Sequence, residues 1–157
     1  MKHLSTEFGM KHLGGLSYFL GFSAAHTETD PLLNQSKYAH EILDKADMLF
    51  CKSENTSTDT NSWLSSHAGA PYSDPMYYRS LVGALQYLTF TQPNIAYAVQ
   101  QICLHMHAPF HGHMGVLNRI LRYVQGTIHF HLHMYRSTSH NLRSYTDTDW
   151  AGYTDTR

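Results

Sequence analysis

Between residues 73 and 126 the chain carries three stretches of apolar residues at helical spacing, and these constrain its fold more than any other feature. Ser73-Asp74-Pro75 offers a helix cap followed by proline at the first helical position, and Pro93 starts a second helix. A third helix is predicted over Gly112–Gln125, with Gly126 as its C-terminal stop. The inward-facing positions, three and four residues apart, are Tyr78, Leu81, Val82, Leu85 and Leu88, then Ile95, Ala98, Val99, Ile102 and Met106, then Leu117, Ile120, Leu121 and Val124. Because short loops join these helices, we expect them to pack on one another.

Strands and one further helix are predicted on either side of these three helices. Leu16–Ala25, which is rich in aromatic residues, indicates a buried strand, and Gln35–Phe50 has the spacing of an amphipathic helix. The polar segment Cys51–Pro71 contains too few apolar residues to bury itself, which is typical of a linker on the surface. Histidines alternate with apolar residues over Thr127–Tyr135 and predict a strand, and Leu142–Trp150 is a second strand candidate. The predicted fold class is therefore α+β.

The charge and cysteine content of the chain limit which partners and which cellular compartment we expect for it. Eleven Lys and Arg against twelve Asp and Glu give a formal charge of -1, so no overall field favours nucleic acid or a membrane surface. Two cysteines cannot build a disulfide framework, which indicates a reducing compartment. No stretch approaches the roughly 18 apolar residues of a membrane span, and the N-terminus lacks the apolar core of a secretory signal. We expect an intracellular protein, cytoplasmic or nuclear and not secreted, with no membrane partner.

Seven blocks of the sequence, taken in order, closely resemble the C-terminal part of the reverse transcriptase of copia-type LTR retrotransposons, running into the first strand of RNase H. The blocks are FGMKHLG at 8–14, YFLG at 18–21, QSKY at 35–38, YRSLVGALQYL at 78–88, QPNIAYAV at 92–99, ILRYVQGT at 120–127 and YTDTDWAG at 145–152. The resemblance implies a palm and thumb remnant over 1–50, a flexible linker over 51–74 and a helical thumb or connection over 75–126. Residues 127–157 would then form connection strands and the first strand of an incomplete RNase H-like domain.

The same resemblance bears on catalysis. The polymerases of this family hold two metal ions on paired aspartates of a YVDD-type hairpin, and as aligned this chain begins just downstream of that hairpin. The first RNase H carboxylate corresponds to Asp147, with Asp149 as a weaker metal-directed neighbour, and the remaining carboxylates would lie beyond Arg157. We therefore expect a truncated copy of such an element. Its ancestral activity would be RNA-directed DNA synthesis with Mg²⁺, and this chain alone would have neither independent catalysis nor a specifically bound cofactor.

The resemblance implies that this part of the polymerase binds nucleic acid. In the family the thumb grips the template-primer duplex by shape and phosphate contact. Arg119 and Arg122 are the best phosphate-contact candidates, with Lys11, Arg79 and Arg143 weaker. We expect weak binding to an RNA–DNA hybrid or template-primer duplex, and contact with the remaining polymerase domains within a polyprotein. The alternative is that these basic side chains are only the solvated sides of their elements.

Two readings without catalysis stay open. A metal-binding module is suggested by the run His105, His107, His111 and His113, and by His129, His131 and His133 on one face of a predicted strand, since imidazoles at such spacing can share Zn²⁺, Ni²⁺ or Cu²⁺. A protein-interaction module is suggested by aromatic residues outside the predicted core, namely Tyr77, Tyr87, Phe90, Tyr97 and Tyr123. Cys103 adjoins the apolar stripe, where a thiol is more often inert than nucleophilic.

Overall fold

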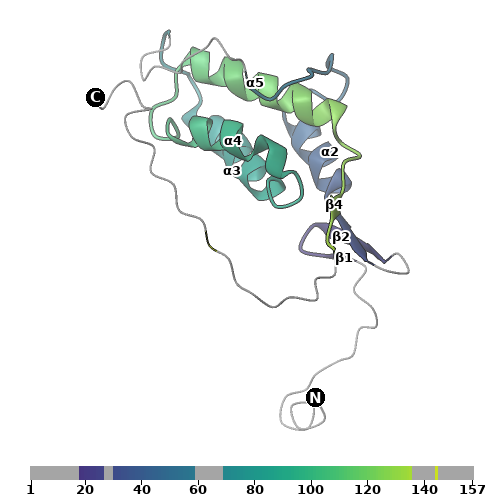
Figure 1. Cartoon of the computed structure of the whole chain (residues 1–157). Coiled ribbons are helices and arrows are strands. Elements are labelled where there is room, and N and C mark those ends of the chain that lie inside the picture. Colours follow the sequence, from purple (N-terminus) through teal and green to yellow (C-terminus); the bar gives the residue numbers. More distant parts are fainter. Residues whose placement is uncertain (1–17, 27–29, 59–68, 136–143, 145–157) are drawn as a thin grey trace, which may run out of the picture.

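The structure, a computed structural model, describes residues 18–26, 30–58, 69–135 and 144, and over these ranges the protein is mixed α+β (Figure 1). Its helices are α2 (Ser36–Lys45), α3 (Pro75–Leu88), α4 (Ala96–Cys103) and α5 (His111–Gly126), with the 3₁₀ helix η1 (Pro93–Ile95) before α4. Its strands are β1 (Tyr18–Phe19), β2 (Phe22–His26), β3 (Pro31–Asn34) and β4 (Leu132–His133). They form one antiparallel sheet in the order β1-β2-β3-β4, which lies at one end of the helical layer, close to α2 (Figure 1). Within the described ranges, no helix is long and apolar enough to cross a membrane.

The three helices predicted between residues 73 and 126 are confirmed. The Asp74 carboxylate accepts the backbone N–H of Tyr77 at 2.9 Å, and Pro75 takes the first helical position of α3. Pro93 begins a short 3₁₀ turn that continues into α4. α5 begins one residue earlier than predicted and includes Gly126, a difference within the usual uncertainty of helix ends.

One hydrophobic core joins all four helices. The predicted inward-facing positions are buried except Met106, which is partly buried, and α2 packs against both α3 and α5. The core residues are Ala39, Ile42 and Leu43 of α2, the five apolar positions of α3 from Tyr78 to Leu88, Ile95, then Ala98, Val99 and Ile102, then Leu117, Ile120, Leu121 and Val124, and Ile128. The Tyr78 hydroxyl lies inside this core and donates to the Ile102 carbonyl at 2.9 Å. The α2 helix is thus part of the helical body.

The N-terminal strand prediction needs a correction. The described part of Leu16–Ala25 is a hairpin, in which Phe19 pairs with Phe22 across a two-residue turn at Leu20 and Gly21. Both turn residues have positive φ, 48° and 81°, which is the geometry of a tight hairpin turn. The prediction of burial was also wrong for the tip, because Tyr18, Phe19 and Leu20 are exposed. Gly21 tolerates the left-handed conformation without steric cost, so the chain reverses there instead of continuing as one strand.

The strand predicted over Thr127–Tyr135 is also shorter in the structure. Only Leu132–His133 is extended and paired, and its partner is β3, with Leu33 opposite Leu132. Thr127 is held at the end of α5 and is not part of the strand. Its hydroxyl donates to the Tyr123 carbonyl at 2.9 Å, and its carbonyl accepts the Gln92 amide at 3.1 Å. Apart from Ser144, the second strand candidate at 142–150 lies outside the described residues.

An aromatic cluster fastens the sheet to the helices. Its members are Phe22 of β2, Tyr38 of α2, Tyr87 of α3 and Phe90 just after α3. The Tyr87 ring contacts the other three edge-on at centroid distances of 5.3–5.8 Å, a geometry that aromatic pairs prefer. Its hydroxyl also donates to the Leu20 carbonyl in the hairpin turn. Tyr87 therefore links the hairpin to the helical core.

Candidate nucleic-acid interface

The outer face of α5 carries the two strongest predicted phosphate contacts. Leu117, Ile120, Leu121 and Val124 face the core, so the helical period leaves Arg119 and Arg122, three residues apart, on the other side. Arg122 keeps 48% of its side-chain surface exposed, and Arg119 is half-buried. The structure thus brings these two guanidinium groups together on one helix face.

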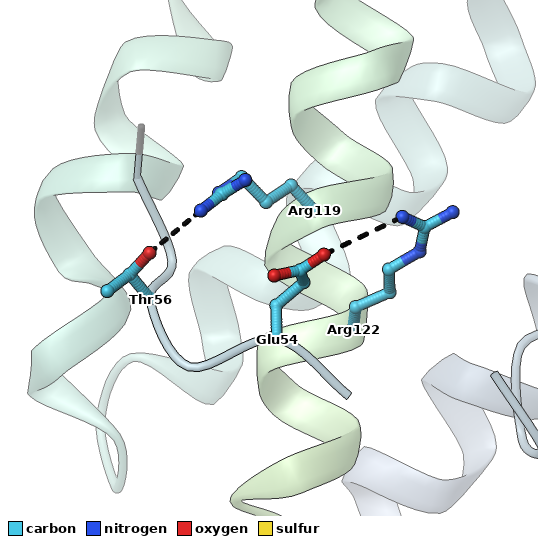
Figure 2. A network of polar contacts seen from close by, with 4 residues as sticks. All are labelled: Glu54, Thr56, Arg119 and Arg122. Carbon is cyan, nitrogen blue, oxygen red and sulfur yellow. Dashed lines mark hydrogen bonds and ion pairs between the residues drawn. The ribbon is translucent and has the colours of Figure 1, made fainter. Parts of the chain in front are cut away.

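Residues 53–56, here called the strap, lie along this face and engage both arginines (Figure 2). Arg122 Nη1 lies 3.9 Å from the Glu54 carboxylate, and the Glu54 backbone N–H donates to the Arg122 carbonyl at 3.3 Å. Arg119 Nη2 donates to the Thr56 hydroxyl at 2.8 Å. At the end of α5, a Cβ added to Gly126 would sit 3.0 Å from Ser53 Cβ, so the glycine lets the strap approach the helix closely. The polar segment after α2 is therefore attached to α5 at several points.

These contacts leave donor capacity on the arginines. A guanidinium carries five N–H donors in a planar fork that suits carboxylate and phosphate oxygens. Arg122 keeps 48% of its side-chain surface exposed, so part of its fork stays accessible, whereas Arg119 Nε is buried and has no hydrogen-bond partner among the described residues. An exposed ion pair of this kind contributes roughly 0–1 kcal/mol to stability. The arrangement can therefore bind an anionic oxygen group, and it already holds one in Glu54.

The other predicted basic contacts do not join this site. Arg79 is exposed on α3, and its Nε donates to the Pro75 carbonyl at 3.2 Å, within its own helix. Lys11 and Arg143 lie outside the described residues, as do the predicted metal carboxylates Asp147 and Asp149. The described interface consequently rests on Arg119 and Arg122.

The structure divides the four clustered histidines into two that are buried and two that are exposed. His105 and His113 are buried and stacked, with ring centroids 3.7 Å apart and planes 15° apart. His113 Nδ1 also accepts the Phe110 backbone N–H at 3.0 Å, which helps to cap α5. His107 and His111 are exposed instead. Stacked rings turn their faces, not their nitrogen lone pairs, toward each other, so this pair has a packing and capping role.

The histidines of the predicted strand are exposed. His133 Nε2 lies 3.6 Å from Asp30 Oδ2, while His129 and His131 are at the surface of the segment before β4. In the part of the chain that the structure describes, no three His, Cys, Asp or Glu side chains form a group that could hold a metal ion.

Cys103 has the environment expected of an inert thiol. The side chain is half-buried at the end of α4 and packs against the core. Burial raises the pKa of the Cys103 thiol, so less of the reactive thiolate is present at neutral pH. The structure therefore gives no support to a nucleophile at this position.

Sequence reasoning missed the residues that hold the arginines. Glu54 and Thr56 belong to a polar segment with no periodicity, and no local signal marks which of its residues will lie against a helix 63 or more positions away.

Lys37 was also missed. Its ammonium lies 5.9 Å from the ring centroid of the exposed Tyr18, a cation–π contact that joins α2 to the hairpin.

Comparison with known proteins finds sequence relatives that cover nearly the whole chain. The chain is 45% identical over 98% of its length to the uncharacterized mitochondrial protein AtMg00810 of Arabidopsis thaliana, of which it covers 64%. It is 38% identical over 97% of its length to the retrovirus-related Pol polyprotein from transposon RE2, and 37% identical over 99% to that from transposon RE1, both of Arabidopsis thaliana.

The chain spans only 10% and 11% of these two polyproteins. No family model matches the chain, and no solved structure matches it. The resemblance of the seven sequence blocks is nevertheless confirmed, because the similarity extends over nearly all of the chain. This protein is thus a homologue of the retrovirus-related Pol polyproteins of copia-type transposons.

Proposed function

We propose that this chain acts as a nucleic-acid-binding segment of a copia-type Pol polyprotein and that it does not catalyse DNA synthesis or hybrid cleavage on its own. The observation that carries the proposal is that nearly the whole chain is similar to Pol polyproteins, although it spans only about a tenth of their length. The printed sequence contains no YVDD-type aspartate pair, and two magnesium ions each require several oxygen ligands. Primer extension or hybrid cleavage by the purified chain, abolished by EDTA, would contradict the second half of this proposal.

The proposed ligand is the phosphate backbone of an RNA–DNA hybrid or template-primer duplex. Arg119 and Arg122 present planar donor forks on one face of α5, and such forks suit phosphate oxygens. Because the formal charge of the chain is -1, attraction has to come from this local pair and not from the whole molecule. The binding should therefore be weak, insensitive to base sequence and strongly dependent on salt.

A salt series tests this binding directly. Affinity for a fluorescently labelled RNA–DNA hybrid should fall as salt rises, and Arg119→Gln or Arg122→Gln should each reduce the logarithmic salt slope by about 1. Arg79→Gln is the matched control, because it removes the same charge from an exposed arginine whose Nε donates to the Pro75 carbonyl within α3. A slope near zero for the unmodified chain would refute phosphate binding, and equal effects of all three substitutions would refute a site on α5.

A second candidate function is contact with other parts of a polyprotein. It is favoured by exposed aromatic side chains, since Phe19 is 60% exposed, Phe90 64% and Tyr97 67%. Exposed apolar groups of this size often mark interfaces. Sedimentation at increasing concentration should show association that Phe19→Ser and Tyr97→Ser reduce. A monomer at every concentration would count against this candidate.

A further inference from the structure

We infer that the strap, residues 53–56, is a built-in competitor for the phosphate site on α5, with the Glu54 carboxylate in the place that a backbone phosphate would take on Arg122. A bound duplex would therefore have to displace the strap. This inference rests on the proposed function, because it describes how access to that same site is regulated.

The first support is the geometry of the contacts. Figure 2 shows the Glu54 side chain lying between Arg119 and Arg122, with its carboxylate directed toward the Arg122 guanidinium. Thr56 supplies a second oxygen to Arg119 at 2.8 Å. A carboxylate and a phosphate both present oxygen pairs to the same guanidinium fork, so one excludes the other from the atoms that it occupies.

The second support is that the strap is attached by weak, reversible contacts. The Glu54–Arg122 distance is 3.9 Å and both side chains are more than a third exposed, so water and salt screen their attraction. Ser53, Asn55 and Thr56 are exposed polar residues, and no described residue of the strap belongs to the hydrophobic core. A duplex offers many phosphates and can replace both oxygen partners at once. The strap has no buried apolar side chain that would oppose this displacement.

The third support is the sign of the charges. While the strap lies on α5, the Glu54 carboxylate pairs with the Arg122 guanidinium and also repels an approaching phosphate. Both effects reduce the affinity for nucleic acid. Removing the Glu54 charge should reverse both effects together. Removing the Thr56 hydroxyl should release Arg119 without any change of charge.

The experiment compares strap variants by fluorescence anisotropy with a labelled RNA–DNA hybrid at low salt. Glu54→Gln should tighten binding by about two- to fivefold, the range expected when an exposed ion pair is released. Thr56→Val should tighten it by a smaller factor, since one hydrogen bond is lost and no negative charge is removed. Glu41→Gln is the matched control, because Glu41 is an exposed acid of α2 and its loss changes the net charge equally.

A double-substitution cycle makes the test specific to the pair. The gain from Glu54→Gln should shrink in an Arg122→Gln background, where there is no guanidinium to release and only the loss of charge repulsion remains. Hydrogen exchange gives a second readout, because the Glu54 amide, bonded to the Arg122 carbonyl, should exchange faster when hybrid is added.

The outcomes separate the two proposals. Salt-dependent binding that Glu54→Gln leaves unchanged, or that Glu41→Gln tightens equally, would overturn the strap inference and leave the nucleic-acid function standing. An unchanged exchange rate at Glu54 in the bound state would also overturn the inference. No binding by the unmodified chain or by any variant would refute the nucleic-acid function itself, and the strap inference with it.

Discussion

Replacing Tyr78 with phenylalanine tests the packing of the helical body that carries the arginine pair. Tyr78 is fully buried, and its hydroxyl donates to the Ile102 carbonyl at 2.9 Å. Tyr78→Phe keeps the ring and removes only this donor. The Ile102 carbonyl also accepts the His105 backbone N–H at 3.3 Å, so it does not lose its only partner. The cost should therefore be that of one ordinary buried hydrogen bond, about 1 kcal/mol in the free energy of unfolding.

The pH dependence of stability gives this prediction a second, independent readout. Burial raises the pKa of Tyr78 far above its usual value, so the unfolded chain ionises first as pH rises above about 10. Because the unfolded state then holds fewer protons than the folded state, the stability from neutral Tyr78 is present below about pH 10 and declines above it, by about 1.4 kcal/mol per pH unit. Tyr78→Phe removes this contribution and should flatten the alkaline decline.

Urea denaturation followed by circular dichroism, at pH 7 and at several alkaline pH values, measures both effects. Tyr77→Phe is the control, because Tyr77 is only partly buried and the pKa of its phenol is raised less than that of Tyr78. A Tyr78→Phe protein that matches the unmodified chain at pH 7 and loses stability equally fast at alkaline pH would refute this account of the core.

Three further predictions concern the ends of the helices and the cysteine. Asp74→Ala removes the carboxylate that accepts the Tyr77 N–H and should lower the unfolding free energy by about 1 kcal/mol in thermal denaturation, whereas Asp74→Asn should cost much less. His113→Phe preserves a ring against His105 but removes the acceptor for the Phe110 N–H, so it should cost about 1 kcal/mol, while the exposed His107→Phe should change stability little. Cys103 should react with a thiol reagent more slowly in the folded chain than in urea, because burial raises its pKa; equal rates in Cys51→Ser protein with and without urea would contradict this.

The sequence predicts those parts of the fold that depend on local signals. Asp74 and Pro75 begin α3 because a cap and a fixed φ act within one helical turn. Gly126 was predicted as the stop of the last helix, but it is the final residue of α5, and Thr127 follows it as the C-cap. The hairpin at Leu20 and Gly21 was missed because its turn lacks the usual Asn-Gly signal, and its aromatic residues suggested one buried strand. The pairing of β4 with β3 joins residues about a hundred positions apart, so no local pattern contains it.

The same distinction applies to the candidate site. The helical period places Arg119 and Arg122 on one face of α5, because apolar residues fix which side is buried. Whether such a face is available to phosphate depends instead on what else in the chain can reach it, and here Glu54 and Thr56 reach it from a segment whose composition predicts only a linker. An arginine pair on a helix is thus evidence for an anion site, while its first occupant is a carboxylate of its own chain. In this protein the affinity for nucleic acid should therefore be set as much by residues 53–56 as by the two arginines.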